Sequence, residues 1–592
     1  MSEGLIFTND NCVGCNRCVR VCSSFGASIS NSGPKNSSIS INSERCIVCG
    51  ACIDVCAHDA RHYIDSTSQF LEDLANGESI TVLVAPSFEA KYPREYAHVF
   101  ATLRKLGVRR ILPVSLGADI CTWAYLKCME QGMTAMISTS CPAVVSYVEH
   151  WLPDMIGQLM PVKSPLMCLA TYCREELGIT DMIAFLGPCI AKGIEVDRYN
   201  ELVQYNVTFP KLMEELRPQL VDEESAFDDM DYGLGSYYPA PGGLADNVRW
   251  FLGDDTPIRI ISGKQYLYQR FETNRRRAFS NELSITELPY ALIDALNCQE
   301  GCIEGTARAR EDHEDKGLAH IHQIRTASKS AREASPWNQD RTPAERLARL
   351  NEQFSSLKLE SYKATFEDQS GSCRVNTPTP EEADAIFHSL RKYDRESRHI
   401  NCSACGYESC HEMMVAIHNG FNSRYNCVYF EKEEAIYLSR MSFGDQLTGV
   451  MNRNALERLS NELYGRNHSL GLIVADVNGL KQENDTHGHS AGDWLIISTA
   501  KALANEFGRE RVFRTGGDEF LVVLQDFDAE EIREDMNKVK EHLDAVGVSV
   551  SMGMAYGSNH QNDFEVLQKR ADAEMYRDKA RYYETTGAQR RH

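Results

Sequence analysis

The sequence predicts an α/β protein built from several domains. Its 592 residues exceed the usual size of one domain, and 43% apolar with 25% charged residues is typical of globular proteins. From about residue 80 to residue 320, short apolar runs such as Ile80-Thr-Val-Leu-Val-Ala-Pro86 alternate with helix-like segments. Near the C-terminus, the two glycines of Arg514-Thr-Gly-Gly-Asp-Glu-Phe520 separate two β-like runs and predict a hairpin turn, because glycine takes positive φ without steric cost.

Charge and composition exclude some classes of partner. The net charge of −22 is unsuited to nucleic acid, and no basic amphipathic stretch suits a membrane surface. Residues 1–7 lack the basic and apolar regions of a signal peptide, and no apolar run reaches the roughly 18 residues that span a bilayer. We therefore expect a cytoplasmic protein. In that reducing compartment, the 21 cysteines predict metal or cluster ligands rather than disulfides.

The first eight cysteines form two repeats of one spacing. Each repeat has the pattern Cys-x2-Cys-x2-Cys-x3-Cys, which is the bacterial ferredoxin spacing for two [4Fe–4S] clusters. Because the fourth cysteine of each repeat serves the other cluster, one cluster is assigned to Cys12, Cys15, Cys18 and Cys56, and the other to Cys46, Cys49, Cys52 and Cys22. Ser23 and Ala57 replace the usual following proline. Structural zinc, which normally groups cysteines in pairs, is the alternative.

Four further cysteines lie in three motifs of the alternating region. The motifs are Thr139-Ser-Cys-Pro142, Gly187-Pro-Cys-Ile-Ala-Lys-Gly-Ile-Glu195 and Asn297-Cys-Gln-Glu-Gly-Cys302, with Lys163-Ser-Pro165 between the first two. Their order resembles that of the catalytic domain of iron-only ([FeFe]) hydrogenases. The resemblance implies that a third cubane is held by Cys141, Cys189, Cys298 and Cys302. It also implies that Cys302 can bridge to a two-iron subcluster and that Lys192 contacts a subcluster ligand.

This region departs from the hydrogenase pattern at several positions. Ser140 stands where the family has a proton-carrying cysteine, and a hydroxyl is a poor relay because its pKa is far above that of a thiol. The other departures are Gly187 and Leu296 for two methionines, Ala124-Tyr125 for an acidic pair, Met160 for a serine, and Gly305-Thr-Ala307 for a glycine-rich end. We therefore expect a cubane without fast hydrogen turnover, and the two-iron subcluster is left open.

A connector and a second cysteine group follow. Residues 326–380 are polar and are interpreted as a linker, with a helix predicted at Gln353-Phe-Ser-Ser-Leu357 and a connector at Asn376-Thr-Pro-Thr-Pro380. Asn401-Cys-Ser-Ala-Cys-Gly-Tyr-Glu-Ser-Cys410 with Cys427 resembles the small four-cysteine [4Fe–4S] domain of redox and corrinoid proteins, which implies that Cys402, Cys405, Cys410 and Cys427 are ligands. Zinc could use the same four. Residues 428–443 predict one helix, with no glycine and no flexible Gly/Ser-rich run, that can transmit a change onward. The remaining cysteines, interpreted as ordinary thiols, are Cys121, Cys128, Cys168, Cys173 and Cys373.

The last quarter of the chain carries five separated motifs. They are Asp445-Gln-Leu-Thr-Gly-Val-Met-Asn-Arg453, Asp476-Val-Asn-Gly-Leu-Lys481, Asn484-Asp-Thr-His-Gly-His489 with Asp493, the Gly-Gly-Asp-Glu turn, and Ala571-Asp-Ala-Glu-Met-Tyr576 with Lys579. In this order they resemble the GGDEF family of diguanylate cyclases. The resemblance implies the condensation of two GTP molecules to cyclic di-GMP, with Mg²⁺ or Mn²⁺ as the metal.

Residue types and the family resemblance together predict a metal site and a nucleotide site. Mg²⁺ prefers carboxylates with phosphate oxygens and water, and paired ions can clamp the nucleophile and the leaving group. Asp476 is expected to face the catalytic candidates Asp518 and Glu519, and the family adds the carbonyl of Val477. The implied GTP contacts are Asn484 and Asp493 at guanine with His489 nearby, Gly479 to Lys481 at the phosphates, and Lys579 at the γ-phosphate.

Two departures from the cyclase pattern modify these expectations. Tyr582-Tyr583 follow where the family often has Gly-Arg-Asn, and we expect this to alter affinity. Many cyclases also carry an Arg-x-x-Asp product site, whose arginine holds guanine and phosphate through bidentate donors. Here that span is Phe507-Gly-Arg-Glu510, so tight product inhibition is not expected.

The sequence thus predicts a redox-responsive diguanylate cyclase, with hydrogen as one candidate signal. The expected ligands and partners are GTP, about four [4Fe–4S] clusters, a second copy of the chain and an electron carrier such as ferredoxin. The alternatives are an iron–sulfur oxidoreductase with a regulatory GTP site and an inactive sensor with binding modules at both ends. The predicted domains are a two-cluster ferredoxin module at 1–76, a hydrogenase-like domain at 77–325, a linker at 326–380, a four-cysteine domain with its helix at 381–443, and a GGDEF domain at 444–592.

Overall fold

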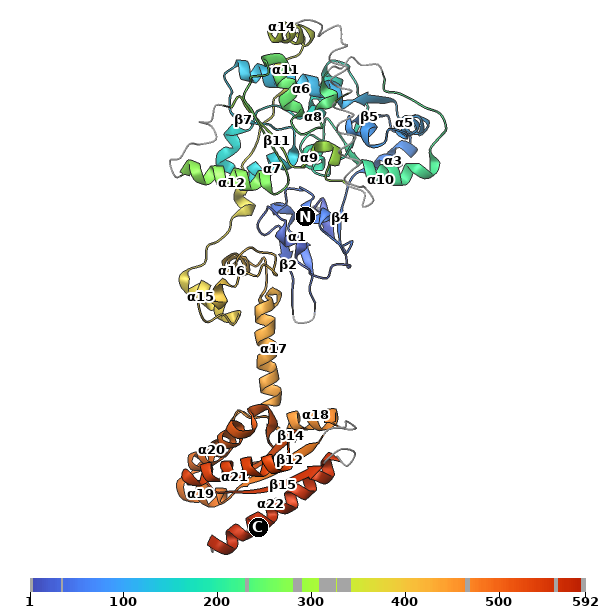
Figure 1. The fold of residues 1–592 in the computed structure, drawn as a ribbon. Coiled ribbons are helices and arrows are strands. Elements are labelled where there is room, and N and C mark those ends of the chain that lie inside the picture. The colour runs from blue at the N-terminus through green and yellow to red at the C-terminus, as the bar shows by residue number, and fades with distance from the viewer. Residues whose placement is uncertain are drawn as a thin grey trace. The chain divides into compact units, whose positions relative to one another are not determined.

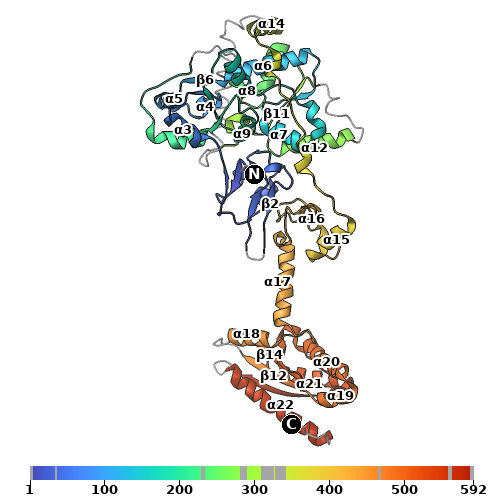
Figure 2. The same ribbon diagram turned by 180° about the vertical axis from the view of Figure 1, so that it is seen from behind.

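The chain folds into two compact units, Met1–Phe430 and Glu431–His592. The structure is a computed structural model, shown from two sides in Figures 1 and 2. It describes residues 4–33, 36–228, 234–279, 290–307, 326, 342–463, 469–557 and 563–586. In these ranges, no helix combines the length and the apolar character that crossing a bilayer requires.

The first unit begins with two small antiparallel pairs of strands. The pairs are β1 (Ile6–Thr8) with β4 (Arg61–Tyr63), and β2 (Ser28–Ser30) with β3 (Ile39–Ile41). The third cysteine of each repeat lies on a short helix, α1 (Arg17–Arg20) or α2 (Ala51–Asp54). Asn16 and Gly50 precede these helices in the left-handed conformation, with φ of 64° and 75°. The repeated spacing is therefore matched by a repeated backbone turn.

Two parallel sheets form the middle of the first unit (Figure 1). The larger sheet has the order β6-β5-β8-β9, with β5 (Ile80–Val84), β6 (Arg110–Pro113), β8 (Met182–Gly187) and β9 (Tyr205–Thr208). The smaller sheet has the order β10-β11-β7, with β7 (Met136–Ile137), β10 (Ile258–Ser262) and β11 (Leu292–Leu296). Parallel pairing requires crossover connections, which explains the alternation of apolar runs and helices in the sequence.

Helices connect and cover these sheets. They are α3 (Thr67–Ala75), α4 (Ser87–Lys91), α5 (Tyr96–Lys105), α6 (Val114–Glu130), α7 (Pro142–Trp151), α8 (Pro165–Glu175), α9 (Lys192–Arg198), α10 (Phe209–Leu216), α11 (Gly243–Leu252) and α12 (Tyr266–Phe279). Helix α6 is buried around most of its circumference, as a central helix should be. It packs closely on α8, since a Cβ at Gly117 would lie 2.1 Å from the Pro165 carbonyl oxygen.

The segment interpreted as a connector packs onto this region where the structure describes it. Helix α14 (Pro343–Gln353) begins with a capping box between Thr342 and Glu345. Beyond it, the rings of Phe354 and Tyr362 lie 6.1 Å from that of Trp123 on α6. The helix lies earlier than the sequence predicts, because α14 ends at Gln353 and the expected helical stretch Gln353–Leu357 forms a turn whose Phe354 and Leu357 belong to the core rather than to a free linker. The domain boundaries themselves stay predictions.

The four-cysteine region packs against the ferredoxin-like strands. Its helices are α15 (Pro380–Ser389), α16 (Cys410–His418) and α17 (Val428–Phe443), and α17 has the bounds that the sequence predicts. Asn16 and Asn426 exchange two amide hydrogen bonds, of 2.6 and 3.0 Å. Gly406 has φ of 92°, and a Cβ there would lie 2.7 Å from the Val19 side chain. The close approach of the two cysteine regions therefore depends on this glycine.

The second unit contains an antiparallel sheet with the order β13-β14-β12-β15. The strands are β12 (Leu470–Val477), β13 (Val512–Arg514), β14 (Glu519–Gln525) and β15 (Val550–Gly557), and the helices are α18 (Arg453–Leu463), α19 (Leu480–His487), α20 (His489–Phe507), α21 (Ala529–Ala545) and α22 (Phe564–Thr586). Every residue of β12 is buried, so it is the central strand. The predicted hairpin is present, with Arg514 of β13 opposite Phe520 of β14.

Candidate functional site

The register of the second unit's sheet brings the predicted metal carboxylates together. Asp476 of β12 lies opposite Glu519 of β14. The amide of Val477 donates a hydrogen bond of 3.1 Å to the carbonyl of Asp518 in the hairpin turn. Asp476, Asp518 and Glu519 therefore share one edge of the sheet, where the sequence places them.

The electrostatics of this edge favour a cation. Burial raises the pKa of Asp476, the Lys579 ammonium at 2.5 Å opposes that shift, and Asp518 and Asp572 add to it. Burial, Asp476 and Asp518 likewise raise the pKa of Glu519. Carboxylates crowded in this way repel one another, and a divalent ion would relieve the repulsion. The donor set thus fits Mg²⁺ or Mn²⁺, although no three Cys, His, Asp or Glu side chains in the described ranges converge tightly enough to form a preformed single-ion site.

An arginine fixes the catalytic turn to the start of the second unit. Arg514 donates to both carboxylate oxygens of Asp445, at 3.1 and 3.3 Å, and to the carbonyl of Gly517 at 2.7 Å. Asp445 also accepts hydrogen bonds from the amide and the hydroxyl of Thr448. Because Asp445 follows closely after α17, this ion pair connects the end of that helix with the turn that carries Asp518.

The predicted guanine residues lie on α19 and α20. A Cβ at Gly492 would stand 2.0 Å from the Oδ1 atom of Asn484, so the two helices bring these residues into contact. That Oδ1 atom is buried and has no hydrogen-bond partner among the residues that the structure describes. A buried amide oxygen without a donor is costly, and a guanine N–H would satisfy it. His489, Asp493 and Lys481 are exposed on the same pair of helices.

Two residues near this site received no role from the sequence. Asp572 of α22 lies close enough to Asp476 and Glu519 to raise the pKa of both. The hydroxyl oxygen of Tyr582, one of the departures, lies 4.0 Å from the point where a Cβ of Gly479 would stand. Gly479 precedes α19 in the predicted phosphate segment, so Tyr582 adjoins that segment. The sequence signal for Asp572 is its place within the Ala571–Tyr576 motif.

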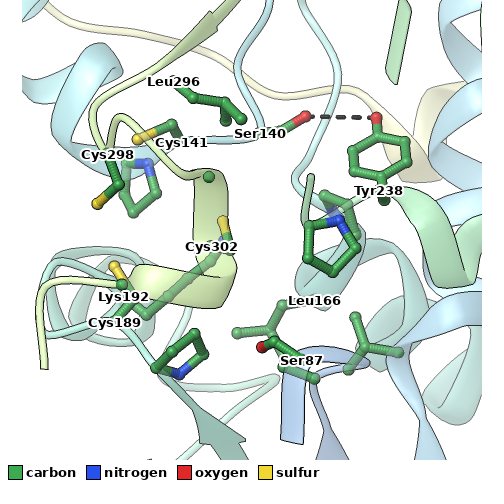
Figure 3. A pocket seen from close by; sticks show the side chains of 18 of the residues that line it. Ser87, Ser140, Cys141, Leu166, Cys189, Lys192, Tyr238, Leu296, Cys298 and Cys302 are labelled. Atoms are coloured by element: carbon green, nitrogen blue, oxygen red, sulfur yellow. Dashed lines mark hydrogen bonds between the residues drawn. The ribbon is translucent and has the colours of Figure 1, made fainter. Parts of the chain in front are cut away.

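The four cysteines of the hydrogenase-like region face one cavity (Figure 3). Cys141 lies between β7 and α7, Cys189 follows β8, and Cys298 and Cys302 follow β11. Loops that follow strands of both parallel sheets therefore converge at the cavity. The cavity has about 90 Å³ of free space and a mainly apolar lining that includes Leu166 and Leu296. The four residues predicted to hold one cluster are thus brought together.

The thiols of this cavity share an environment that disfavours uncompensated negative charge. Burial, followed by repulsion from neighbouring thiols, raises the pKa of Cys141 to about 11 and that of Cys302 above its ordinary value. Burial acts to lower the pKa of Lys192, but Glu195 and the thiols of Cys189 and Cys302 outweigh it and raise that pKa. Iron would supply the positive charge that four thiolates require, so the donor set fits a cubane.

The residues that replace the hydrogenase pattern take part in buried hydrogen-bond networks. Ser140 points toward Tyr238, with 3.3 Å between the two hydroxyl oxygens (Figure 3). The Tyr125 hydroxyl accepts from the Thr139 amide at 2.7 Å, and the Thr139 hydroxyl lies within hydrogen-bond distance of the Met160 carbonyl, at 3.1 Å. Burial raises the pKa of Tyr125 and of Tyr238 far above their usual range. Hydroxyls that hold their protons this tightly are poor proton carriers near neutral pH.

In one of the two N-terminal cysteine sets, the fourth cysteine of the first repeat lies near thiols of the second repeat, as the sequence predicts. Burial and then Cys22 raise the pKa of Cys46 to about 12, and burial and then Cys49 raise that of Cys22 to about 11. For the other set, Cys18 lies near Cys12 and Cys15. The contacts of Cys56 seen here are mainly with nearby backbone amides. Cluster binding by both sets stays a prediction.

Arg61 is a buried cation between the two sets that the sequence did not reveal. It donates to the Sγ atom of Cys18 at 3.3 Å and to the Thr8 hydroxyl at 2.7 Å. Burial acts to lower the pKa of Arg61, but the thiols of Cys18 and Cys52 outweigh it and raise that pKa. A buried guanidinium beside thiols is compatible with an anionic cluster.

The four later cysteines also gather. Burial and the neighbouring thiols of Cys427 and Cys402 raise the pKa of Cys405 to about 11. Cys410 in turn lies near Cys427, the residue that precedes α17. The four thiols are therefore neighbours, although in the described residues no three of them converge as tightly as a single zinc ion requires.

Two side chains lie between neighbouring cysteine sets. Asn297 donates to the carbonyl of Cys49 at 3.1 Å and contacts the Sγ atom of Cys298 at 3.6 Å. Tyr407 is buried between Cys22 and Cys405, and burial followed by these two thiols raises its pKa. The set of Cys22 and Cys46 consequently adjoins both the hydrogenase-like set and the four-cysteine set.

Family comparisons cover most of the length of the chain. Residues 11–60 match a 4Fe-4S dicluster domain, and residues 78–306 match the C-terminal domain of the iron-only hydrogenase large subunit. Residues 442–584 match the diguanylate cyclase GGDEF domain.

Curated relatives match only part of the chain. An uncharacterized membrane protein of Staphylococcus haemolyticus is 32% identical over 145 residues, which are 22% of this chain and 41% of the relative. One from Staphylococcus aureus is 32% identical over 127 residues, 19% of this chain and 36% of the relative. The chain thus spans about two fifths of the length of these relatives.

Solved structures match the two larger regions. The coiled coil and GGDEF domain of DgcB from Caulobacter crescentus, in complex with c-di-GMP, covers 25% of this chain and 87% of its own, with 24% identity and a TM-score of 0.24. The [FeFe]-hydrogenase HydA1 from Chlamydomonas reinhardtii covers 52% of this chain and 100% of its own, with 16% identity and a TM-score of 0.36. On the family matches, the chain contains a 4Fe–4S dicluster domain, an iron-only hydrogenase large-subunit domain and a GGDEF domain of the diguanylate cyclase family.

Proposed function

We propose that this protein is a diguanylate cyclase whose synthesis of cyclic di-GMP from two GTP molecules is set by the redox state of its iron–sulfur sites. The observation that carries the cyclase proposal is the convergence of Asp476, Asp518 and Glu519 at one sheet edge, with Lys579 beside them. These groups suit a reaction in which charge grows on phosphate oxygens.

The side chains of this edge have separate tasks in the proposed reaction. Asp476, Asp518 and Glu519 would hold the divalent metal, which when bound neutralises charge on the nucleophile and the leaving pyrophosphate. Metal binding would also free Lys579 from Asp476, and its ammonium could then contact the γ-phosphate. Asn484, through its unpartnered Oδ1 atom, would accept an N–H of guanine and so orient the nucleotide.

A second copy of the chain is the proposed partner. Each GGDEF site would hold one GTP, so the reaction needs two such domains facing each other. Helix α17 exposes a series of large apolar side chains, at 37% for Ile436, 45% for Tyr437, 55% for Leu438 and 47% for Met441. Apolar side chains gathered on one exposed helix favour self-association.

In the proposed redox input, electrons move between the neighbouring cysteine sets. Electrons from a carrier such as ferredoxin could enter the hydrogenase-like or ferredoxin-type clusters and reach the four-cysteine site. The placement of Asn297 and Tyr407 between successive sets supports this order, because electron transfer requires short separations. The hydrogenase-like region is proposed as an input rather than a hydrogenase, because the hydroxyls around Ser140 hold their protons tightly.

Replacement of Asp518 tests the cyclase proposal. Asp518→Ala should lower cyclic di-GMP synthesis from GTP by roughly 10²–10³-fold, because the site loses one of its few anionic metal ligands. The electron paramagnetic resonance (EPR) signals of the clusters should be unchanged. Asp544→Ala, which removes an exposed carboxylate of α21, is the matched control and should leave synthesis intact. Unchanged synthesis in Asp518→Ala, or none in the native protein, would refute the proposal.

A further inference from the structure

Lys392 is a buried lysine in the turn after α15. Its side chain is 2% exposed, and the preceding residue, Arg391, has φ of 57°, a left-handed conformation that costs a non-glycine residue energy. The Lys392 amide donates to the Phe387 carbonyl at 2.9 Å, and its carbonyl accepts from Arg398 at 3.1 Å. The backbone therefore holds the side chain toward the interior.

The ammonium group contacts three different parts of the four-cysteine region. It donates to the Ser397 carbonyl at 2.5 Å and lies 3.6 Å from the Sγ atom of Cys410. It also lies 4.3 Å from the ring centroid of Tyr429. Tyr429 belongs to the first turn of α17 and is two residues after Cys427. One cation thus contacts both a predicted cluster ligand and the helix that leads toward the GGDEF domain.

The contacts of Lys392 indicate which group could compensate the positive charge of its buried ammonium. A buried ammonium is costly unless a negative group is close, and here the close groups are a carbonyl, a thiol and an aromatic ring. Four thiolates around a cluster would provide the missing negative charge.

We propose that Lys392 is a positioning residue that converts the charge of the four-cysteine cluster into a displacement of the first turn of α17. One electron would pass from the cluster that Cys46, Cys49, Cys52 and Cys22 would hold to the cluster that Cys402, Cys405, Cys410 and Cys427 would hold, and no bond would be made or broken. The added negative charge draws the ammonium toward Cys410 and weakens its contact with Tyr429, because a cation–π contact competes with a direct ionic one. This inference rests on the proposed redox control.

The first test measures the reduction potential of the four-cysteine cluster. In the full-length protein, Lys392→Met removes the cation and keeps the volume of the side chain. The reduced cluster should become harder to form, with the oxidised-to-reduced ratio at a fixed potential rising about tenfold, a shift of about 59 mV for one electron. EPR-monitored titration reports it. Lys358→Met removes an exposed lysine of the same unit and should leave the potential unchanged.

The second test measures the coupling to α17. Hydrogen exchange of the amides at residues 428–433 should differ between oxidised and reduced native protein. This redox-dependent difference in exchange should disappear both in Lys392→Met and in Tyr429→Leu. In contrast, Tyr429→Leu should change the oxidised-to-reduced ratio of the cluster at a fixed potential by less than twofold. Because Tyr429→Leu keeps the buried cation, it tests the coupling even where Lys392→Met folds poorly.

The outcomes separate this inference from the cyclase proposal. An unchanged potential in Lys392→Met, exchange at residues 428–433 that ignores the redox state, or zinc in place of iron at the four cysteines would each overturn it. None of these readouts requires nucleotide. Loss of cyclic di-GMP synthesis alone would refute the cyclase proposal and leave these measurements interpretable.

Discussion

At the scale of single residues, Gly492 controls the position of Asn484. Gly492→Ala would place a Cβ 2.0 Å from the present position of the Asn484 Oδ1 atom, so the amide must rotate away. Losing one hydrogen bond to guanine costs about 1–1.5 kcal/mol, which corresponds to roughly a tenfold rise in the KM for GTP. Steady-state kinetics of cyclic di-GMP formation measures this rise. Ser490→Ala, at an exposed neighbour in the same helix, should not change KM, and an unaltered KM in Gly492→Ala would exclude Asn484 from nucleotide binding.

At the scale of elements, the four-cysteine region should hold its cluster independently of the ferredoxin module. Four sets of four ligands predict about sixteen irons per chain, and Cys405→Ala should remove about four of them. The EPR signals of the ferredoxin-type pair should persist, since those ligands come from other strands and helices. Cys373→Ala, at a buried thiol outside every set, is the control. About eight irons together with stoichiometric zinc in the native protein would show that the two later sites are not clusters.

At the scale of the whole molecule, the hydrogenase-like domain should evolve hydrogen slowly or not at all. No single residue accounts for this expectation, because Ser140, Tyr125 and Met160 belong to hydrogen-bond networks of hydroxyls, carbonyls and the Cys121 thiol, in which the tyrosine hydroxyls hold their protons tightly. Ser140→Cys alone should therefore not produce high activity in an assay with reduced dye. Ser140→Ala is the matched control, and both variants should retain the iron of the native protein. High turnover in the native protein would show that protons reach the cavity by another route.

The family matches confirm the ferredoxin-type, hydrogenase-like and GGDEF resemblances recognised in the sequence, and the mixed α/β class is confirmed with them; the resemblance of residues 401–427 to a four-cysteine [4Fe–4S] domain stays a prediction. This much was predictable because ligand spacing and turn chemistry are local. Two or three residues between cysteines, or two glycines before an acidic pair, are visible without knowing the fold. Helix α17 was predicted at its observed bounds for the same reason, since a continuous run without glycine or proline specifies a helix.

Contacts between distant residues were decided only by the tertiary structure. Lys392 meets Cys410 and Tyr429, Arg61 meets Cys18, and Tyr407 lies between Cys22 and Cys405, and none of these pairings has a spacing that a sequence reveals. The polar composition of residues 326–380 likewise predicts a linker, whereas in the structure Phe354 and Tyr362 of this segment pack on Trp123. The sequence by itself determined which side chains can bind iron, metal and nucleotide. The tertiary structure decided which buried cations and rings surround them, because burial and charge at a site depend on segments that meet only after folding.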